Sequence, residues 1–159
     1  MKNPTETWSL DREIVLAKLL NHPRDKVFAA WTNPDALAKW YGPEGLDIET
    51  KEADIREGGV WRFDMVGTFE GKPQRFENHV RFLEIVPNER IVMDYGTPEP
   101  DDPERFRMTV TFDEQSDGKT VVTLRQLHPT RERRLAVIGF GAVEYGLQTL
   151  EGLAIWLDG

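Results

Sequence analysis

The chain has 159 residues and a formal net charge of −8, with 39% apolar and 30% charged residues. This length predicts one domain with one hydrophobic core, and the five tryptophans, three tyrosines and eight phenylalanines separate the sequence from disordered chains. Because a chain with this excess of acidic residues lacks the basic surface that phosphate binding requires, we expect no nucleic-acid partner.

The absence of cysteine excludes disulfides and thiolate chemistry and is typical of a reducing compartment. The longest strongly apolar run, residues 135–143, is far shorter than the roughly 20 residues that cross a bilayer. The N-terminus carries acidic residues and lacks the apolar segment of a secretion signal. We therefore expect a cytoplasmic protein without membrane contact, with a single domain over residues 1–159 in which residues 1–10 form a flexible segment.

The first elements are a strand and two short helices. Residues 14–20 form an apolar run with a β-branched start, and the sequence Asn21-His22-Pro23 after it indicates that a strand ends and a helix begins. Asn33-Pro34-Asp35 repeats this signal, with an N-cap side chain, a proline at the first helical position and an acid beside it. Both helices are complete before Gly42-Pro43.

Residues 46–128 alternate between apolar and polar side chains, which is the period of strands. Turn residues at 58–59, 67–73, 87–88, 96–104 and 116–118 divide this region into six strands, mostly joined as hairpins. The alternation gives the sheet an aromatic inner face, opposite Arg62 and Asp64. The residues predicted to face inward are Trp61, Phe63, Met65, Phe76, Asn78, Val80, Phe82, Ile91, Met93, Tyr95, Phe106, Met108, Val110, Phe112, Val122, Leu124, Gln126 and His128.

The last thirty residues return to helical spacing and predict one long C-terminal helix that covers the sheet. Its apolar seam consists of Phe140, Val143, Leu147, Leu150, Ala154 and Leu157, and a stripe of small residues beside it consists of Gly139, Ala142, Gly146 and Thr149. Interior glycines each cost a helix about 1 kcal/mol relative to alanine. Two explanations stay open: close packing of the backbone on the sheet, or space left for another molecule.

Two charged segments flank the predicted inner face. Arg131, Arg133 and Arg134 fall in the first turn of the long helix, where the helix dipole disfavours cations. They form either a solvated face, partly compensated by Glu132, or a place where an anion is held. The acidic stretch at 96–104 is a connector between two strands that could also act as a lid.

Several kinds of active site are excluded by elimination. The only serines, Ser9 and Ser116, lie near the N-terminus and in a hairpin turn, which leaves no serine nucleophile with a base. The three histidines occur singly on separate elements, without the spacing of a metal site. Gly58-Gly59 leads into a strand and lacks the helix N-terminus of a phosphate loop. We expect neither a metal nor a cofactor.

What remains is an apolar inner face with a few isolated polar groups, which is how ligand pockets are built. Tyr95 and His128 lie at strand ends, where a cavity would open. The predicted ligand-binding residues are Trp61, Phe63, Met65, Asn78, Met93, Tyr95, Met108, Gln126, His128, Phe140, Val143 and Leu147.

Short motifs in a shared order resemble those of the START-like (SRPBCC) superfamily, in particular the proteins related to the activator of the heat shock protein 90 ATPase. The similar segments are AWTNP at 30–34, KWYGP at 39–43, GGVWRF at 58–63, EIVPNER at 84–90, VTF at 110–112, TL at 123–124 and GLQTLEGL at 146–153. The resemblance covers roughly residues 12–157. It implies an α+β helix-grip fold, in which a curved antiparallel sheet of about seven strands wraps around the long C-terminal helix and encloses a cavity.

The resemblance does not fix an activity, because the superfamily includes lipid carriers, cyclases, and hydroxylases with an added iron-sulfur domain. The eukaryotic chaperone activators carry a separate N-terminal chaperone-binding domain, and only thirteen residues precede the first predicted strand here. We therefore do not expect direct stimulation of a chaperone.

Three hypotheses about function follow, in order of preference. The first is a binding protein that holds a small apolar or amphipathic molecule between the sheet and the C-terminal helix and is not an enzyme. The second is a homodimeric interaction protein, or a chaperone-related stress-response protein, that uses the small-residue stripe or the exposed aromatics Trp8 and Tyr41. The third is a cofactor-free enzyme of the cyclase or dehydratase type, with His128 or Glu144 as general base and Tyr95 as acid.

Overall fold

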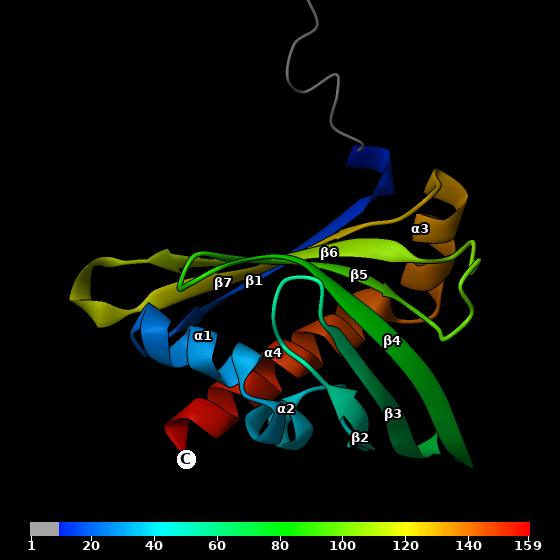
Figure 1. Ribbon diagram of the computed structural model, residues 1–159, viewed down its shortest axis with the longest axis horizontal. Coiled ribbons are helices and arrows are strands. Elements are labelled where there is room, and N and C mark those ends of the chain that lie inside the picture. Colours follow the sequence, from blue (N-terminus) through cyan, green and yellow to red (C-terminus); the bar gives the residue numbers. More distant parts are fainter. Residues whose placement is uncertain (1–9) are drawn as a thin grey trace, which may run out of the picture.

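The computed structural model describes residues 10–159. Seven antiparallel strands form one curved sheet in the order β1-β7-β6-β5-β4-β3-β2 (Figure 1), and six of them are the strands that the alternation predicted. The strands are β1 (Glu13–Leu20), β2 (Leu46–Ala53), β3 (Val60–Phe69), β4 (Lys72–Val86), β5 (Arg90–Gly96), β6 (Phe106–Glu114) and β7 (Thr120–Leu127). The predicted flexible segment at residues 1–10 lies outside the described residues except for Leu10, which begins a short 3-10 helix at Leu10–Arg12.

The helices lie on the concave side and at one end of this sheet. They are α1 (Arg24–Thr32), α2 (Pro34–Trp40), α3 (Arg131–Gly139) and α4 (Ala142–Asp158), and a second 3-10 helix occupies Ser116–Gly118. Figure 1 shows α4 crossing the concave face, with α1 and α2 beside its C-terminal part and α3 beyond its N-terminal end. The side chain of Asn33 caps α2 by accepting from the backbone of Asp35 and Ala36, as the Asn-Pro-Asp signal predicted.

The predicted long C-terminal helix is interrupted, which corrects two details of the sequence analysis. Gly141 adopts a φ of 98°, a left-handed conformation that ends one helix and begins the next. The helix that covers the sheet is therefore the 17-residue α4, and Arg131, Arg133 and Arg134 belong to the first turns of α3.

The interruption also changes the predicted apolar seam. Phe140 caps α3 and is 71% exposed, and Leu147 is 47% exposed. The residues of α4 that are buried against the rest of the protein are Thr149, Leu150, Leu153 and Leu157.

Close packing explains both glycines of α4. A side-chain carbon on Gly146 would overlap Cδ1 of Leu16 in β1, and one on Gly152 would lie 2.9 Å from the carbonyl oxygen of Trp40. Larger residues at these positions would push α4 away from the sheet and from α2. The glycines therefore let the helix approach both elements.

The aromatic core lies between α1, α2 and the sheet. Trp31 and Trp40 are almost fully buried and meet edge to face at 4.8 Å between ring centroids. Trp40 donates a hydrogen bond from its indole Nε1 to the carbonyl of Ala30 at 2.9 Å. Trp61 stacks on Phe63 at 3.8 Å. Trp31 and Trp40 join α1 to α2, and Trp31 also contacts Phe112 of β6 edge to face, which holds the helix pair against the sheet.

The predicted inner face is confirmed over most of the sheet but differs at two places. Val80, Phe82, Val110 and Val122 are buried, whereas Phe76, on the part of β4 near the β3–β4 turn, is 37% exposed. Asp64, predicted on the outer face, is buried because it forms ion pairs with residues of the neighbouring strands. Its partners are Arg75 on β4 at 2.5 Å and Lys51 on β2 at 3.2 Å.

Candidate functional site

A cavity of about 550 Å³ lies between the sheet, α3 and the N-terminal half of α4, and it is open to solvent. Its walls are mostly apolar, as is typical of sites for small molecules. The lining residues are Tyr41, Pro43, Leu46, Met65, Phe69, Glu70, Gln74, Phe76, Tyr95, Phe106, Met108, Gln126, His128, Arg133, Val137, Phe140, Ala142, Tyr145, Gly146 and Thr149.

The apolar end of the cavity is formed where the β3–β4 hairpin meets α4. Phe69 contacts Tyr145 of α4 edge to face at 5.2 Å and Phe76 of β4 at 5.7 Å. Met65 adds a flexible apolar side chain from β3. Glu70, in the hairpin turn, is an exposed residue of the lining on this side.

Two tyrosines form a hydroxyl pair in the cavity wall. Tyr41 follows α2 and packs edge to face on Trp61 at 5.1 Å, and its hydroxyl oxygen lies within hydrogen-bond distance of that of Tyr95, at 3.4 Å. Burial raises the pKa of Tyr41 to about 12, although the hydrogen bond with Tyr95 lowers it somewhat. Burial and the neighbouring Tyr41 raise the pKa of Tyr95 well above 10. Both phenols are therefore neutral at physiological pH.

At the opposite end from the hairpin, Gln126 and His128 form a second polar pair. Nε2 of His128 lies 3.0 Å from Oε1 of Gln126. Because a carbonyl oxygen only accepts, His128 carries its proton on Nε2, and Nδ1 is an acceptor that is buried without a partner among residues 10–159. Burial, and then the charges of Arg133 and Arg134, lower the pKa of His128 to about 4, so its ring is neutral.

Aromatic stacking places these polar pairs in one wall. The ring of Phe106 stacks on Tyr95 at 5.1 Å and lies 4.8 Å from the ring of His128. The three side chains form a row across β5, β6 and the end of β7. Met108 and Gln126 form the adjacent row, since they are paired in register.

Arg133 of α3 carries a positive charge at this end of the cavity. Its Nη2 atom lies 3.1 Å from Oε2 of Glu104, in the loop between β5 and β6. Its Nε atom is buried and has no hydrogen-bond partner within the described part of the chain. Glu104 is 57% exposed, so this ion pair is largely solvated and weak.

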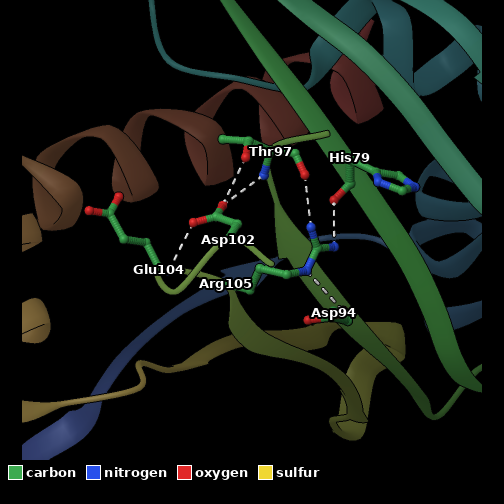
Figure 2. Close-up of polar contacts among 6 residues, drawn as sticks. All are labelled: His79, Asp94, Thr97, Asp102, Glu104 and Arg105. Carbon is green, nitrogen blue, oxygen red and sulfur yellow. Dashed lines mark hydrogen bonds and ion pairs between the residues drawn. The ribbon is translucent and has the colours of Figure 1, made fainter. Parts of the chain in front are cut away.

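The β5–β6 loop is held in place by its own hydrogen bonds, which Figure 2 shows. Asp102 accepts from the backbone and hydroxyl of Thr97 at 3.1 and 3.0 Å and from the backbone of Glu104 at 2.9 Å. The guanidinium of Arg105 donates to Asp94 at 3.1 Å, to the carbonyl of Thr97 at 2.8 Å and to that of His79 at 3.2 Å. This structure positions Glu104 beside Arg133.

Half of the predicted ligand-binding residues line this cavity. They are Met65, Tyr95, Met108, Gln126, His128 and Phe140. Trp61, Phe63 and Met93 lie deeper, in the packed core. Asn78 is half-buried and donates to the backbone carbonyl of Phe76 at 3.0 Å. Val143 and Leu147 lie on α4 outside the lining.

Other lining residues were not among those predicted. Tyr41 was expected to be exposed, but it is half-buried in the aromatic core because the turn after α2 directs it toward the sheet. Phe69, Val137 and Tyr145 come from the hairpin end and the two helices, whose placement strand alternation does not predict. Trp8, the other aromatic predicted to be exposed, lies outside the described residues.

The catalytic candidates are not all brought together. Tyr95 and His128 share the cavity, whereas Glu144 is exposed on α4 and does not line it. Within residues 10–159, no group of three or more His, Asp or Glu side chains is arranged to hold a metal ion. The same residues include no helix that is long and apolar enough to span a membrane.

A second depression, the α1–α4 groove, lies on the outside of the helices and has a volume of about 590 Å³. It is lined by Lys26, Ala29, Ala30, Asn33, Ala36, Ile155, Trp156, Leu157 and Gly159. Unlike the cavity, it is bounded by helices alone and contains no orphaned buried polar atom among the described residues. We therefore take the cavity as the candidate site.

A curved antiparallel sheet that wraps a C-terminal helix, with an open cavity between them, defines a START-like protein of the helix-grip class. The model of the family described as Activator of Hsp90 ATPase homolog 1-like protein matches residues 21–157, and the chain belongs to this family. A search of curated proteins found no match.

Solved structures share the fold over nearly the whole chain. A crystal structure of a protein from Chromobacterium violaceum is 27% identical with a TM-score of 0.74, and the match covers 93% of this chain and 98% of that one. A crystal structure from Nitrosomonas europaea is 23% identical with a TM-score of 0.82, covering 95% and 97%. A solution structure from Arthrobacter aurescens is 17% identical with a TM-score of 0.83, covering 94% and 87%.

Proposed function

We propose that this protein binds a small apolar or amphipathic molecule in the cavity between the sheet and α4. The observation that carries the proposal is the cavity of about 550 Å³, which is open, has mostly apolar walls and includes in its lining His128 and Arg133, each with a buried nitrogen that has no partner among residues 10–159. Such a combination is typical of ligand sites, because apolar walls supply affinity and sparse polar groups orient the ligand. The proposed location of the protein is the cytoplasm.

A neutral, environment-sensitive dye, N-phenyl-1-naphthylamine, tests the proposal without presupposing a charge. We expect saturable binding of one dye per protein, seen as increased fluorescence. Ala142→Trp and Val137→Trp each add a large side chain to the cavity wall from a different helix. Each is expected to weaken binding at least about tenfold, because the added ring occupies space that the dye needs.

Two matched controls place the binding site. Leu147→Trp adds the same ring to an exposed position of α4 outside the lining, and Ala29→Trp adds it to the α1–α4 groove. Both are expected to retain the affinity of the original protein. Binding that is lost with Ala29→Trp and kept with Ala142→Trp and Val137→Trp would contradict the proposal, as would a folded protein that binds no dye. Circular dichroism checks that each variant is folded.

A further inference from the structure

At the α3 end of the cavity, Gln126, the tyrosine pair and Arg133 offer hydrogen-bond donors, while Nδ1 of His128 is a buried acceptor. The Oε1 atom of Gln126 already accepts from His128, which leaves its amide NH₂ group as the available part of the side chain. The hydroxyls of Tyr41 and Tyr95 share one hydrogen bond, so one of their two protons has no acceptor among residues 10–159. A ligand that satisfies these two groups has to present an acceptor.

Arg133 adds three features to this donor set: charge, geometry and availability. Its guanidinium has five N–H donors, and within the described chain the contact with Glu104 is the one it makes. The buried Nε atom has no acceptor, which is costly for a charged group. Glu104 is more than half exposed, so an acceptor inside the apolar cavity competes with it at little cost.

The charges around the cavity are distributed unevenly along its length. The positive charges of Arg133 and Arg134 act on the end at His128, and they contribute to the lowered pKa of that ring. Glu70 lies in the lining at the hairpin end, where it disfavours a negative group. The middle of the cavity is lined by apolar side chains such as Met65 and Met108. This arrangement fits a molecule with a negative group at one end and an apolar body.

Resting on the binding function proposed above, we infer that the ligand is an amphipathic monocarboxylate. Its carboxylate is received by Arg133, with Gln126 and Tyr95 as further donors. A carboxylate is an acceptor only and can take several donors at once, and the planar guanidinium matches its two oxygens. The apolar body extends toward Phe69 and Phe76 at the hairpin end.

Three probes with the same chain and different head groups test this inference: decanoate, decanamide and decylammonium. Each is titrated against protein carrying N-phenyl-1-naphthylamine, and the concentration that displaces half of the dye is measured at pH 7.5. We expect decanoate to displace the dye at a concentration at least about tenfold lower than decylammonium and about fivefold lower than decanamide, since charge-assisted hydrogen bonds are the stronger ones.

The variant Arg133→Gln is expected to reduce the advantage of decanoate over decanamide to less than about twofold, because the ratio depends on the charge of Arg133. The matched control is Arg131→Gln, an exposed arginine of the same helical turn outside the lining, which should retain the full advantage. Tyr95→Phe removes one hydroxyl donor and should reduce the advantage by a smaller factor. Comparing ratios within each variant cancels any general change in dye affinity.

The inference is overturned if the three probes displace the dye equally, or if Arg133→Gln and Arg131→Gln show the same preference for decanoate. In both cases dye binding itself would stand, and so would the proposed function. If neither the dye nor any of the three probes binds, as checked by calorimetry, the proposed function fails together with the inference.

Discussion

Gly146 of α4 lies directly against Leu16 of β1, so that a methyl group on Gly146 would overlap the Cδ1 atom of the leucine. Leu16 is itself buried, at 8% exposure. This contact brings the helix close to the edge of the sheet, although the same helix borders an open cavity through Ala142, Gly146 and Thr149. The two explanations offered for the small residues therefore apply to the same segment of α4.

The contact predicts that Gly146→Ala destabilises the protein by about 1–2 kcal/mol, because overpacking outweighs the gain in helix propensity of about 1 kcal/mol. In a Leu16→Ala background the same substitution should stabilise by up to about 1 kcal/mol, since the obstructing side chain is absent. Urea unfolding of the four proteins measures both values. Equal effects of Gly146→Ala in the two backgrounds would show that Leu16 is not the obstacle.

The buried carboxylate of Asp64 predicts that the free energy of unfolding decreases at acidic pH. Burial raises its pKa, but hydrogen bonds and ion pairs with Arg75 and Lys51 lower it more, so the pKa lies below the ordinary 3.8. Its contribution is therefore complete above about pH 5 and is lost as pH falls through 3.8 toward the lower pKa of the folded state.

Asp64→Asn should cost about 1–3 kcal/mol of unfolding free energy at pH 7, because Arg75 and Lys51 lose a charged partner. The difference in melting temperature from the original protein should narrow below pH 4. Glu77, paired in register with Asp64 on β4 and exposed, supplies the control Glu77→Gln, which is expected to change stability little. A difference for Asp64→Asn that stays constant from pH 7 to pH 3 would be inconsistent with a lowered pKa.

His128 predicts a second pH dependence, at higher pH. Its pKa is lowered to about 4 in the folded protein, against 6.5 for an unperturbed histidine, so the unfolded chain takes up the proton first. The stability associated with neutral His128 is complete above pH 6.5 and is lost as pH falls from 6.5 to about 4. Between pH 7 and pH 5, the original protein should lose about 1–2 kcal/mol more than His128→Gln. Chemical unfolding of both proteins at pH 7 and pH 5 measures this difference in the free energy of unfolding. His22 and His79 are present in both proteins, so their contributions cancel. Equal losses in the two proteins would contradict a lowered pKa of His128.

The hydrogen bonds of Arg105 predict that it holds the β5–β6 loop. Arg105→Lys keeps the charge but cannot reach Asp94 and the carbonyls of Thr97 and His79 together, since it lacks the planar fork. Hydrogen exchange over residues 97–104 should become several-fold faster, as followed by mass spectrometry. The control Arg107→Lys, at an exposed position of β6, should leave exchange in the loop unchanged. Identical exchange in both variants would mean that Asp102 alone is sufficient.

Sequence patterns predicted the sheet well, because one face of each strand is buried and period-two alternation records that burial. The same reasoning placed Tyr95, Gln126 and His128 on the inner face, and these residues line the cavity from β5 and from the end of β7. It could not show that Asp64 is buried, because the side chains of Lys51 and Arg75 cover it. These residues lie on the neighbouring strands, and alternation within one strand does not predict which residues of two strands lie side by side.

The helices were harder to predict in detail. Apolar spacing continues through residues 135–150, so periodicity alone did not reveal the break, although two glycines in the sequence Gly139-Phe140-Gly141 were a local signal for it. The positions of Tyr41 and Tyr145 in the cavity depend on how α2 and α4 pack on the sheet. Such packing is set by contacts such as Gly146 with Leu16 and Gly152 with Trp40, which join residues far apart in the chain.

The pairing of β1 with β7 has a consequence for how the molecule assembles. Glu13 lies opposite Leu127, so more than a hundred residues separate partners in neighbouring strands. Closing so long a loop is slow, and during synthesis β1 has no partner strand until β7 has been made. Since α4 docks on β1 and follows β7 in the chain, the cavity exists only after α4 has been synthesised, and nascent chains that end before α4 would have no place to hold a guest.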